Sequence, residues 1–258
     1  RRAMARGGSA LSSFRNLNRN ERVASDDRSV LVTVDEWLAA EVAPDALPER
    51  DGPVILGVDL GGSRSMSAAS AYWPMTGRLE CVAAFPTRPG LADRGAADGV
   101  AGRYEEMRDR GEMVTMGDTT VPVDRFLTDV VALLNGQAPA AICGDRFRHA
   151  EFLEALRGAG LDRVPCVWRG MGWRDGSEDC ERFRRALFEG KVKTTPSLLL
   201  RSAFADAITL VDPSGNHKLA KARSLGRIDA AAATVLAVAQ GVRMVGAPEP
   251  KGGRLVFG

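Results

Sequence analysis

Cysteine, histidine and long hydrophobic runs are scarce in this sequence of 258 residues. The four cysteines are far apart and form no Cys-x-x-Cys pair, and there are two histidines, which argues against a disulfide framework or a zinc site and favours reduced thiols. The longest apolar run, Ala230–Ala239, is half a membrane span, and the Arg-rich N-terminus lacks the hydrophobic segment of a signal peptide. We therefore expect neither a membrane protein nor a secreted one.

Charge of one sign is not in excess either. Lysine and arginine number 35 against 33 acidic residues, a net charge of +2, and 45% of the residues are hydrophobic. This globular composition excludes wholesale disorder and gives no global basic field for nucleic acid. Basic residues do cluster locally, in the first 22 residues and again at Lys218, Lys221, Arg223 and Arg227. By composition alone each cluster is a solvated face or a tail.

Composition divides the chain into three parts. Residues 1–50 read as a leader and connector, in which we expect a strand over Ser29–Val34 and a helix over Asp35–Glu41 capped by Asp35. Residues 51–241 form a compact domain, and residues 242–258 form a flexible tail rich in glycine and proline. Because the sequence has no initiator methionine, we expect it to be part of a longer chain.

Hydrophobic patterns predict the elements of the compact domain. Three apolar runs joined by short turns predict an antiparallel meander over Val54–Leu60, Ser67–Trp73 and Leu79–Phe85. Strands over Pro139–Asp145 and Val164–Gly170 then alternate with helices, which predicts parallel strands with helices on the sheet faces. Later helices are expected over Ser177–Gly190, Leu198–Ala205 and Asp229–Gln240. An α/β protein with three antiparallel strands followed by parallel strands alternating with helices has the order of an RNase H-like fold.

Three aspartates occupy positions that suit chemistry. Asp59 and Asp145 lie at the ends of strands, and Asp229 opens the last helix. Ligands of open α/β sheets collect at the carboxyl ends of the strands, so these carboxylates are candidates for one site. Each also has a simpler interpretation: Asp59 as a turn former, Asp229 as an N-cap, and Asp145 as the partner of Arg146.

A cluster of three carboxylates is unfavourable until cations bind to it. Mg²⁺ and Mn²⁺ prefer oxygen ligands, and two such ions would activate a water and stabilise the leaving oxygen of a phosphodiester. His149 follows Asp145 by four residues, and we interpret it as a helix-surface residue rather than a further ligand. We therefore predict that Asp59, Asp145 and Asp229 are both the metal ligands and the catalytic residues.

A nucleotide-binding site is an alternative interpretation of the motif around Asp59. The stretch GVDLGGSRS is similar to the first phosphate loop of sugar kinases and actin-like ATPases. That family needs a second phosphate loop and an adenosine loop, and the sequence contains neither. It also contains no GxxxxGK[ST] motif, so we do not expect this chain to bind ATP.

Three segments together resemble the large terminase subunit of tailed bacteriophages. Phe14–Ala40, with Glu36 and Trp37, is similar to the connector between its ATPase and nuclease halves, and Val54–Ala68 is similar to the first nuclease motif. Thr194–Ala239 is the most specific match, because a basic run leads to Arg-Ile-Asp and an Ala-rich helix. The segment AAICGDRF around Asp145 matches the middle motif more loosely.

This resemblance implies an RNase H-like endonuclease that cuts double-stranded concatemeric DNA during viral genome packaging. It implies Mg²⁺ or Mn²⁺, with two ions, held by the three aspartates. ATP would be used only by an N-terminal half that is not in this sequence. The implied partners are the portal protein and the small terminase subunit, and the implied location is the host cytoplasm at the procapsid portal. The late basic cluster, namely Lys218, Lys221, Arg223 and Arg227, would contact DNA phosphates near the metal site.

One position departs from the family pattern. Many members carry a further aspartate six residues after the first, where this sequence has Ser65. Asp206 and Asp212 are candidates to replace it. The change leaves open a non-catalytic DNA- or portal-binding module, and another RNase H-like nuclease, such as a resolvase, is a further alternative. The Arg- and Gly-rich stretch Pro86–Val121 is either a flap near DNA or a plain surface excursion.

Overall fold

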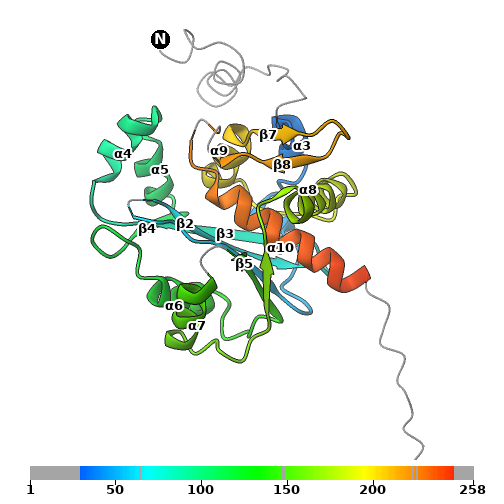
Figure 1. Ribbon diagram of the computed structural model, residues 1–258, viewed down its shortest axis with the longest axis horizontal. Coiled ribbons are helices and arrows are strands. Elements are labelled where there is room, and N and C mark those ends of the chain that lie inside the picture. Colours follow the sequence, from blue (N-terminus) through cyan, green and yellow to red (C-terminus); the bar gives the residue numbers. More distant parts are fainter. Residues whose placement is uncertain (1–29, 64, 147–148, 222–223, 225, 247–258) are drawn as a thin grey trace, which may run out of the picture.

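A mixed sheet of six strands runs through the centre of the protein (Figure 1). The computed structural model describes residues 30–63, 65–146, 149–221, 224 and 226–246. The strands follow the order β4-β3-β2-β1-β5-β6. Their bounds are β1 Ile55–Asp59, β2 Ser67–Trp73, β3 Arg78–Phe85, β4 Met113–Thr115, β5 Ala141–Asp145 and β6 Cys166–Arg169. The first three strands are antiparallel neighbours, whereas β5 is parallel to β1 and to β6, so the predicted order of strand directions is confirmed.

Helices cover both faces of this sheet (Figure 1). On one face lie α6 Val123–Leu133 and α7 His149–Gly158. The opposite face carries α3 Val34–Leu38, α8 Trp173–Phe188, α9 Leu198–Asp206 and α10 Asp229–Gly246. The remaining elements are the short helix η1 Pro44–Ala46, the helices α4 Leu91–Asp98 and α5 Arg103–Asp109, and the hairpin of β7 Thr209–Val211 and β8 His217–Leu219. Each face of the sheet therefore has its own hydrophobic core.

The last helix packs unusually close to the sheet. Gly57 of β1 lies under α10, where a Cβ atom would come within 2.1 Å of the Ala233 carbonyl oxygen. The helix is rich in alanine on this face, and the Ser70 and Thr234 hydroxyls are hydrogen bonded at 2.8 Å in the buried contact. Small residues on both elements thus allow the close approach that brings the first turn of α10 to the end of β1.

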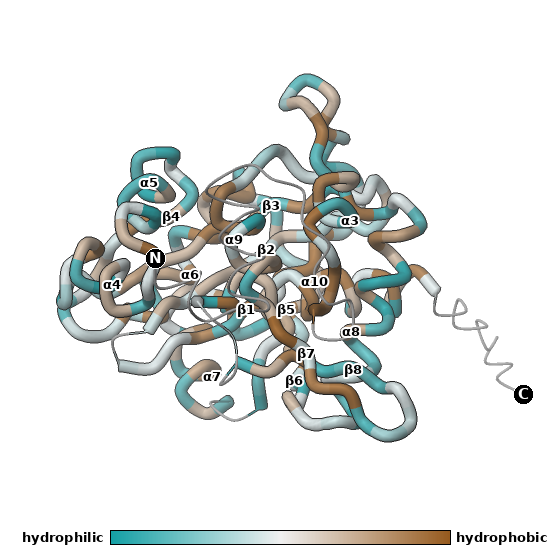
Figure 2. The backbone as a smooth tube through the Cα atoms, turned by 90° about the horizontal axis from the view of Figure 1, so that it is seen from above, coloured by the Kyte–Doolittle hydropathy of each residue, from teal (hydrophilic) through white to brown (hydrophobic). Residues whose placement is uncertain are grey.

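Hydropathy follows this arrangement. Figure 2 shows hydrophobic positions along α10 and the neighbouring strands, and hydrophilic positions on α5 and in the exposed turns. No helix in the described part of the chain is long and apolar enough to cross a membrane.

Several predicted elements need correction. The strand expected over Ser29–Val34 is wrong: among its described residues, Val30 forms an isolated bridge to Ile208 and helix α3 begins at Val34. The helix cap is Thr33 rather than Asp35, because Thr33 and Glu36 form a reciprocal capping box. The stretch 86–121, interpreted from the sequence as a flap or a surface excursion, contains the helices α4 and α5 and the short strand β4.

The connector packs against the same core as the rest of the chain. Trp37 stacks on Phe204 of α9 with ring centroids 4.2 Å apart, and the Glu41 carboxylate pairs with Arg201. At the other end, α10 continues to Gly246, four residues past the expected start of the tail at residue 242. The division of the chain at residues 50 and 241 stays a prediction, and residues 247–258 lie outside the described residues.

Candidate active site

Two of the three predicted aspartates end adjacent parallel strands. Asp59 is the last residue of β1 and Asp145 is the last residue of β5. The register pairs Gly57 with Cys143, so Asp59 and Asp145, each two residues further on, leave the sheet on the same face. This is the face that α10 covers.

The third aspartate reaches the same place from α10. Asp229 is the first residue of that helix, which lies along β1. The Lys221 ammonium joins the two sides: it donates a hydrogen bond to Asp59, and it lies 3.7 Å from Asp229 Oδ1. The charge of Asp145 also acts on both Asp59 and Lys221. The structure therefore brings Asp59 and Asp229 together around one cation, a lysine that the sequence suggested only as a DNA contact, while Asp145 on the adjacent strand acts on Asp59 through its charge.

Burial and the repulsion between neighbouring carboxylates disfavour the ionised forms of Asp59 and Asp229. Asp59 is 4% exposed, and burial together with the nearby Asp229 raises its pKa to about 7 against the opposing effect of Lys221. Burial likewise raises the pKa of Asp229, although Lys221 and Arg227 oppose the shift. Burial disfavours the charge of Lys221, but Asp59 and Asp229 outweigh it and raise the pKa of the ammonium. The two buried carboxylates share the ammonium of Lys221, and the charge of Asp145 acts on Asp59 as well, so negative charge predominates at this place.

Such an excess suits a divalent cation. Carboxylate oxygens are the donors that Mg²⁺ and Mn²⁺ prefer, and here they already surround a positive charge. Within the described residues, however, no three acidic, histidine or cysteine side chains lie close enough to hold a metal ion as they stand. Lys221 takes up the space between Asp59 and Asp229. The donor chemistry thus fits a hard cation, and binding there requires Lys221 to move.

Of the other predicted DNA contacts, Arg227 is close enough to Asp229 for its charge to lower the pKa of that carboxyl group. Lys218 places its ammonium 4.5 Å from the ring centroid of Trp173, which begins α8. Arg227 Nε donates to Asp98 Oδ2 at 2.9 Å. Arg223 lies outside the described residues. The assignment of these basic residues to DNA stays a prediction.

The candidates to compensate for Ser65 have other partners. Ser65 precedes β2, and its amide donates to the Gly62 carbonyl at 3.3 Å. Asp206 pairs with Arg103 at 3.1 Å, and Asp212 closes the β7–β8 turn by accepting hydrogen bonds from Ser214 and Asn216. His149 begins α7, with its ring in an edge contact with Trp168.

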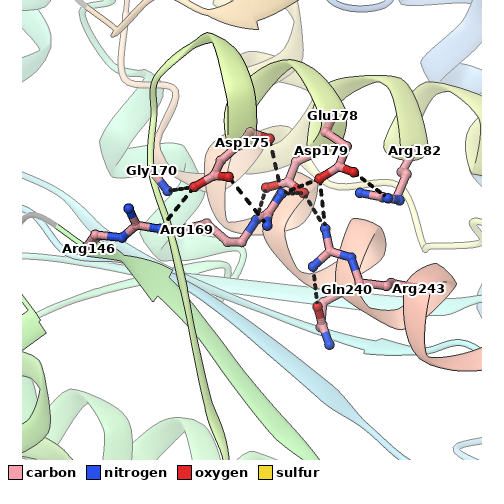
Figure 3. A network of polar contacts seen from close by, with 9 residues as sticks. All are labelled: Arg146, Arg169, Gly170, Asp175, Glu178, Asp179, Arg182, Gln240 and Arg243. Atoms are coloured by element: carbon pink, nitrogen blue, oxygen red, sulfur yellow. Dashed lines mark hydrogen bonds and ion pairs between the residues drawn. The ribbon is translucent and has the colours of Figure 1, made fainter. Parts of the chain in front are cut away.

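A polar network that the sequence did not suggest includes the residues next to Asp145 (Figure 3). Arg169 pairs with Asp145 in the sheet register and donates to both carboxylate oxygens of Asp179 on α8 at 2.8 Å. Arg243 near the end of α10 reaches the same Asp179 carboxylate at 3.2 Å. Arg146, which follows Asp145, pairs with Asp175 at 3.2 Å. The network ties β6, α8 and α10 together, and the contact of Arg243 with Asp179 joins residues 64 apart in the chain.

Comparison with known proteins identifies the family. The family model described as "Terminase large subunit, endonuclease domain" matches residues 7–244. The large terminase subunit of Enterobacteria phage HK97 is 24% identical over 229 residues, which are 88% of this chain and 44% of that protein. This chain therefore spans less than half the length of that relative.

Solved structures show the same fold. The crystal structure of the HK97 large terminase superposes with a TM-score of 0.73 at 21% identity, covering 92% of this chain and 48% of that one. The large terminase nuclease of thermophilic phage G20c with bound magnesium gives a TM-score of 0.50 at 13% identity, covering 82% of this chain and 97% of that one. The RNase H-like fold predicted from the sequence is confirmed by these terminase neighbours. With the family model matching more than nine-tenths of its length, the chain belongs to the family of terminase large subunits and comprises their endonuclease domain.

Proposed function

We propose that this chain is a divalent-metal-dependent endonuclease that cuts concatemeric double-stranded DNA during packaging of a viral genome. The observation that carries the proposal is the pairing of Asp59 and Asp229 with one cation, Lys221, at the carboxyl edge of the sheet, with Asp145 at the end of the neighbouring strand. A terminase nuclease of the same fold with bound magnesium supports it. Contacts with a portal protein and a small terminase subunit, ATP use elsewhere in a longer protein, and action in the host cytoplasm at the procapsid belong to the same proposal.

In this proposal the three aspartates hold Mg²⁺ or Mn²⁺, with two ions in the complete site. When bound, such ions activate a water and stabilise the charge that develops on the phosphate and on the leaving oxygen. Asp59 and Asp145 are held in place by their strands, and Asp229 by the close packing of α10 on β1. This rigid support fixes the directions of the carboxylates before the metal arrives.

In this proposal Lys221 is the cation that occupies the site when no metal ion is bound. Its ammonium neutralises part of the carboxylate charge while no other cation is bound. A divalent ion that binds both Asp59 and Asp229 has to compete with it. We also propose that Lys221, once a metal ion has replaced it between the carboxylates, contacts DNA phosphates together with Lys218 and Arg223.

Plasmid cleavage tests the proposal. Supercoiled DNA is incubated with the 258-residue chain in Mn²⁺, in Mg²⁺ or in EDTA. We expect nicking and linearisation that need the metal, and a loss of about a hundredfold or more in Asp59→Asn, Asp145→Asn and Asp229→Asn. Asp212→Asn is the matched control, because its carboxylate closes an exposed turn and an asparagine oxygen can accept the same hydrogen bonds.

Two results would contradict the nuclease. Cleavage that persists in EDTA, or that all three substitutions leave intact, would place the chemistry elsewhere. DNA binding without cleavage in either metal would favour the non-catalytic DNA- or portal-binding module, for which Ser65 and the position of Lys221 are the supporting observations.

A further inference from the structure

The residues just before Asp229 are held by the segment between β3 and α6. This segment, residues 86–121, carries α4 and α5 on the side of the sheet that also carries α9 and α10 (Figure 1). Asp98, the last residue of α4, accepts hydrogen bonds from Arg227 Nε at 2.9 Å and from Arg227 Nη2 at 3.4 Å. Tyr104, which is 2% exposed, donates its hydroxyl proton to Asp98 Oδ2 at 2.8 Å. Asp98 is therefore fixed by α5 and in turn fixes Arg227.

A second contact reaches the neighbouring residue. Arg103 at the start of α5 pairs with Asp206 at the end of α9, and both side chains are largely buried. Gly226 lies directly against this pair, since a Cβ atom there would come within 2.4 Å of Asp206 Oδ2. Ile228 is buried in the core next to α10. Each of the three residues before Asp229 is thus held by a different group.

We propose that Asp98 and Tyr104 are positioning residues for the Asp229 carboxylate, acting through Arg227. The inference rests on the proposed function, in which Asp229 holds a metal ion. The carboxylate of a residue at the start of a helix depends on the backbone that leads into it, and this backbone runs from Gly226 to Ile228. By holding Arg227, Asp98 and Tyr104 fix the position of this backbone to within the few tenths of an ångström that a metal ligand requires.

Other roles for the contact between Asp98 and Arg227 predict different effects on DNA affinity, stability and metal affinity. If Arg227 served DNA directly, loss of its partner Asp98 would change DNA affinity and the salt dependence of binding. If the pair only stabilised the fold, its loss would lower the unfolding temperature and leave metal affinity unchanged. A positioning role alone predicts weaker metal binding by a folded protein that still binds DNA.

The experiment measures Mn²⁺ binding by calorimetry on the full chain, without DNA, alongside plasmid cleavage. We expect Asp98→Asn to weaken Mn²⁺ binding and to raise the Mn²⁺ concentration for half-maximal cleavage by about tenfold. DNA binding in EDTA should stay within about twofold of the wild type. Glu106→Gln is the matched control, because it removes an exposed ion pair with Arg110 on α5 and does not touch residues 226–229.

Two further variants make the test specific. The double variant Asp98→Asn with Arg227→Gln should bind Mn²⁺ no more weakly than the worse single variant, because both changes break one contact. Tyr104→Phe removes one hydrogen bond to Asp98 and serves if Asp98→Asn does not fold; we expect a smaller loss, of about threefold, in the same direction.

The outcomes separate this inference from the proposed function. Wild-type affinity for Mn²⁺ in a folded Asp98→Asn, or in Tyr104→Phe if it alone folds, would overturn the positioning role and leave the nuclease standing. A change in DNA affinity with unchanged Mn²⁺ affinity would also overturn it, in favour of a DNA contact. A wild-type chain that binds no Mn²⁺ and cuts no DNA would remove the proposed function and this inference with it.

Discussion

Asp59 is a buried carboxyl group whose charge is opposed by its surroundings. Burial and the neighbouring Asp229 raise its pKa to about 7, and the contact with Lys221 only partly compensates. Such a group destabilises the metal-free protein when it ionises, and it gains most from a cation that restores the balance of charge. Its environment is therefore typical of a functional site rather than of a structural ion pair.

This shift predicts how stability depends on pH. In the unfolded chain Asp59 releases its proton near pH 4, whereas in the folded protein it keeps the proton up to about pH 7. Between these values the folded state binds more protons, so in EDTA this group makes stability fall as pH rises toward 7, with no further loss above it. Asp59→Asn should remove this fall and should be more stable than the wild type at pH 8, by about 1 kcal/mol or more.

Urea unfolding at pH 5 and at pH 8 measures the difference. Asp212→Asn is the control, because hydrogen bonds in its turn lower the pKa of Asp212, the opposite direction. A wild type and an Asp59→Asn variant with parallel pH profiles would contradict the buried, raised carboxyl group.

At the scale of elements, the site depends on the fit between α10 and β1. Gly57 leaves no side chain between the strand and the helix, and the atom that a Cβ would meet is the Ala233 carbonyl oxygen, part of the helix backbone. Backbone cannot move aside as the end of a flexible side chain can. The absence of a side chain at Gly57 therefore determines how closely the Asp59 carboxylate, at the end of β1, approaches the Asp229 carboxylate.

Gly57→Ala should push α10 away from the sheet. We expect a loss of about 3 kcal/mol in the free energy of unfolding, together with weaker Mn²⁺ binding, because the start of α10 moves with the helix. Gly62→Ala is the control, since its Cβ would meet no atom of the described residues within 4 Å, and it should stay within about 0.5 kcal/mol of the wild type. Urea unfolding measures both variants. Equal stability of Gly57→Ala and Gly62→Ala would contradict the close packing of α10 on β1.

Some of the elements around the site are predictable from sequence patterns, and others are not. The ends of β1 and β5 and the start of α10 were predictable, because apolar runs define strands and parallel strands end at one edge. The three-residue strand β4 was not, because its pairing with β3 rather than its own pattern makes it a strand. The contact of Lys221 with Asp59 joins residues 162 apart in the chain, and no local signal predicts it.

At the scale of the whole molecule, one buried carboxylate links a strand of the sheet to two of the helices that cover it. Asp179 of α8 is 3% exposed and receives Arg169 from β6 and Arg243 from α10 (Figure 3). The pair with Arg169 is bidentate, with both distances at 2.8 Å. Asp229 lies at the other end of α10. The contacts of Asp179 with Arg169 and Arg243 therefore help to fix the position of α10 relative to the strands that carry Asp59 and Asp145.

Removing this carboxylate should destabilise the protein more than any exposed ion pair does. Asp179→Ala leaves two guanidinium groups without their buried partner, and we expect a loss of about 3 kcal/mol in the free energy of unfolding. Glu181→Ala, two residues along α8, breaks an exposed pair with Arg185 and should change stability by less than about 0.5 kcal/mol. Urea unfolding at pH 7 compares the two. Because the Asp179 pair is shielded from solvent, the difference should persist at 0.5 M salt, roughly the range in which exposed pairs are screened. A loss in Asp179→Ala no larger than in Glu181→Ala would show that the layers are held by apolar packing alone.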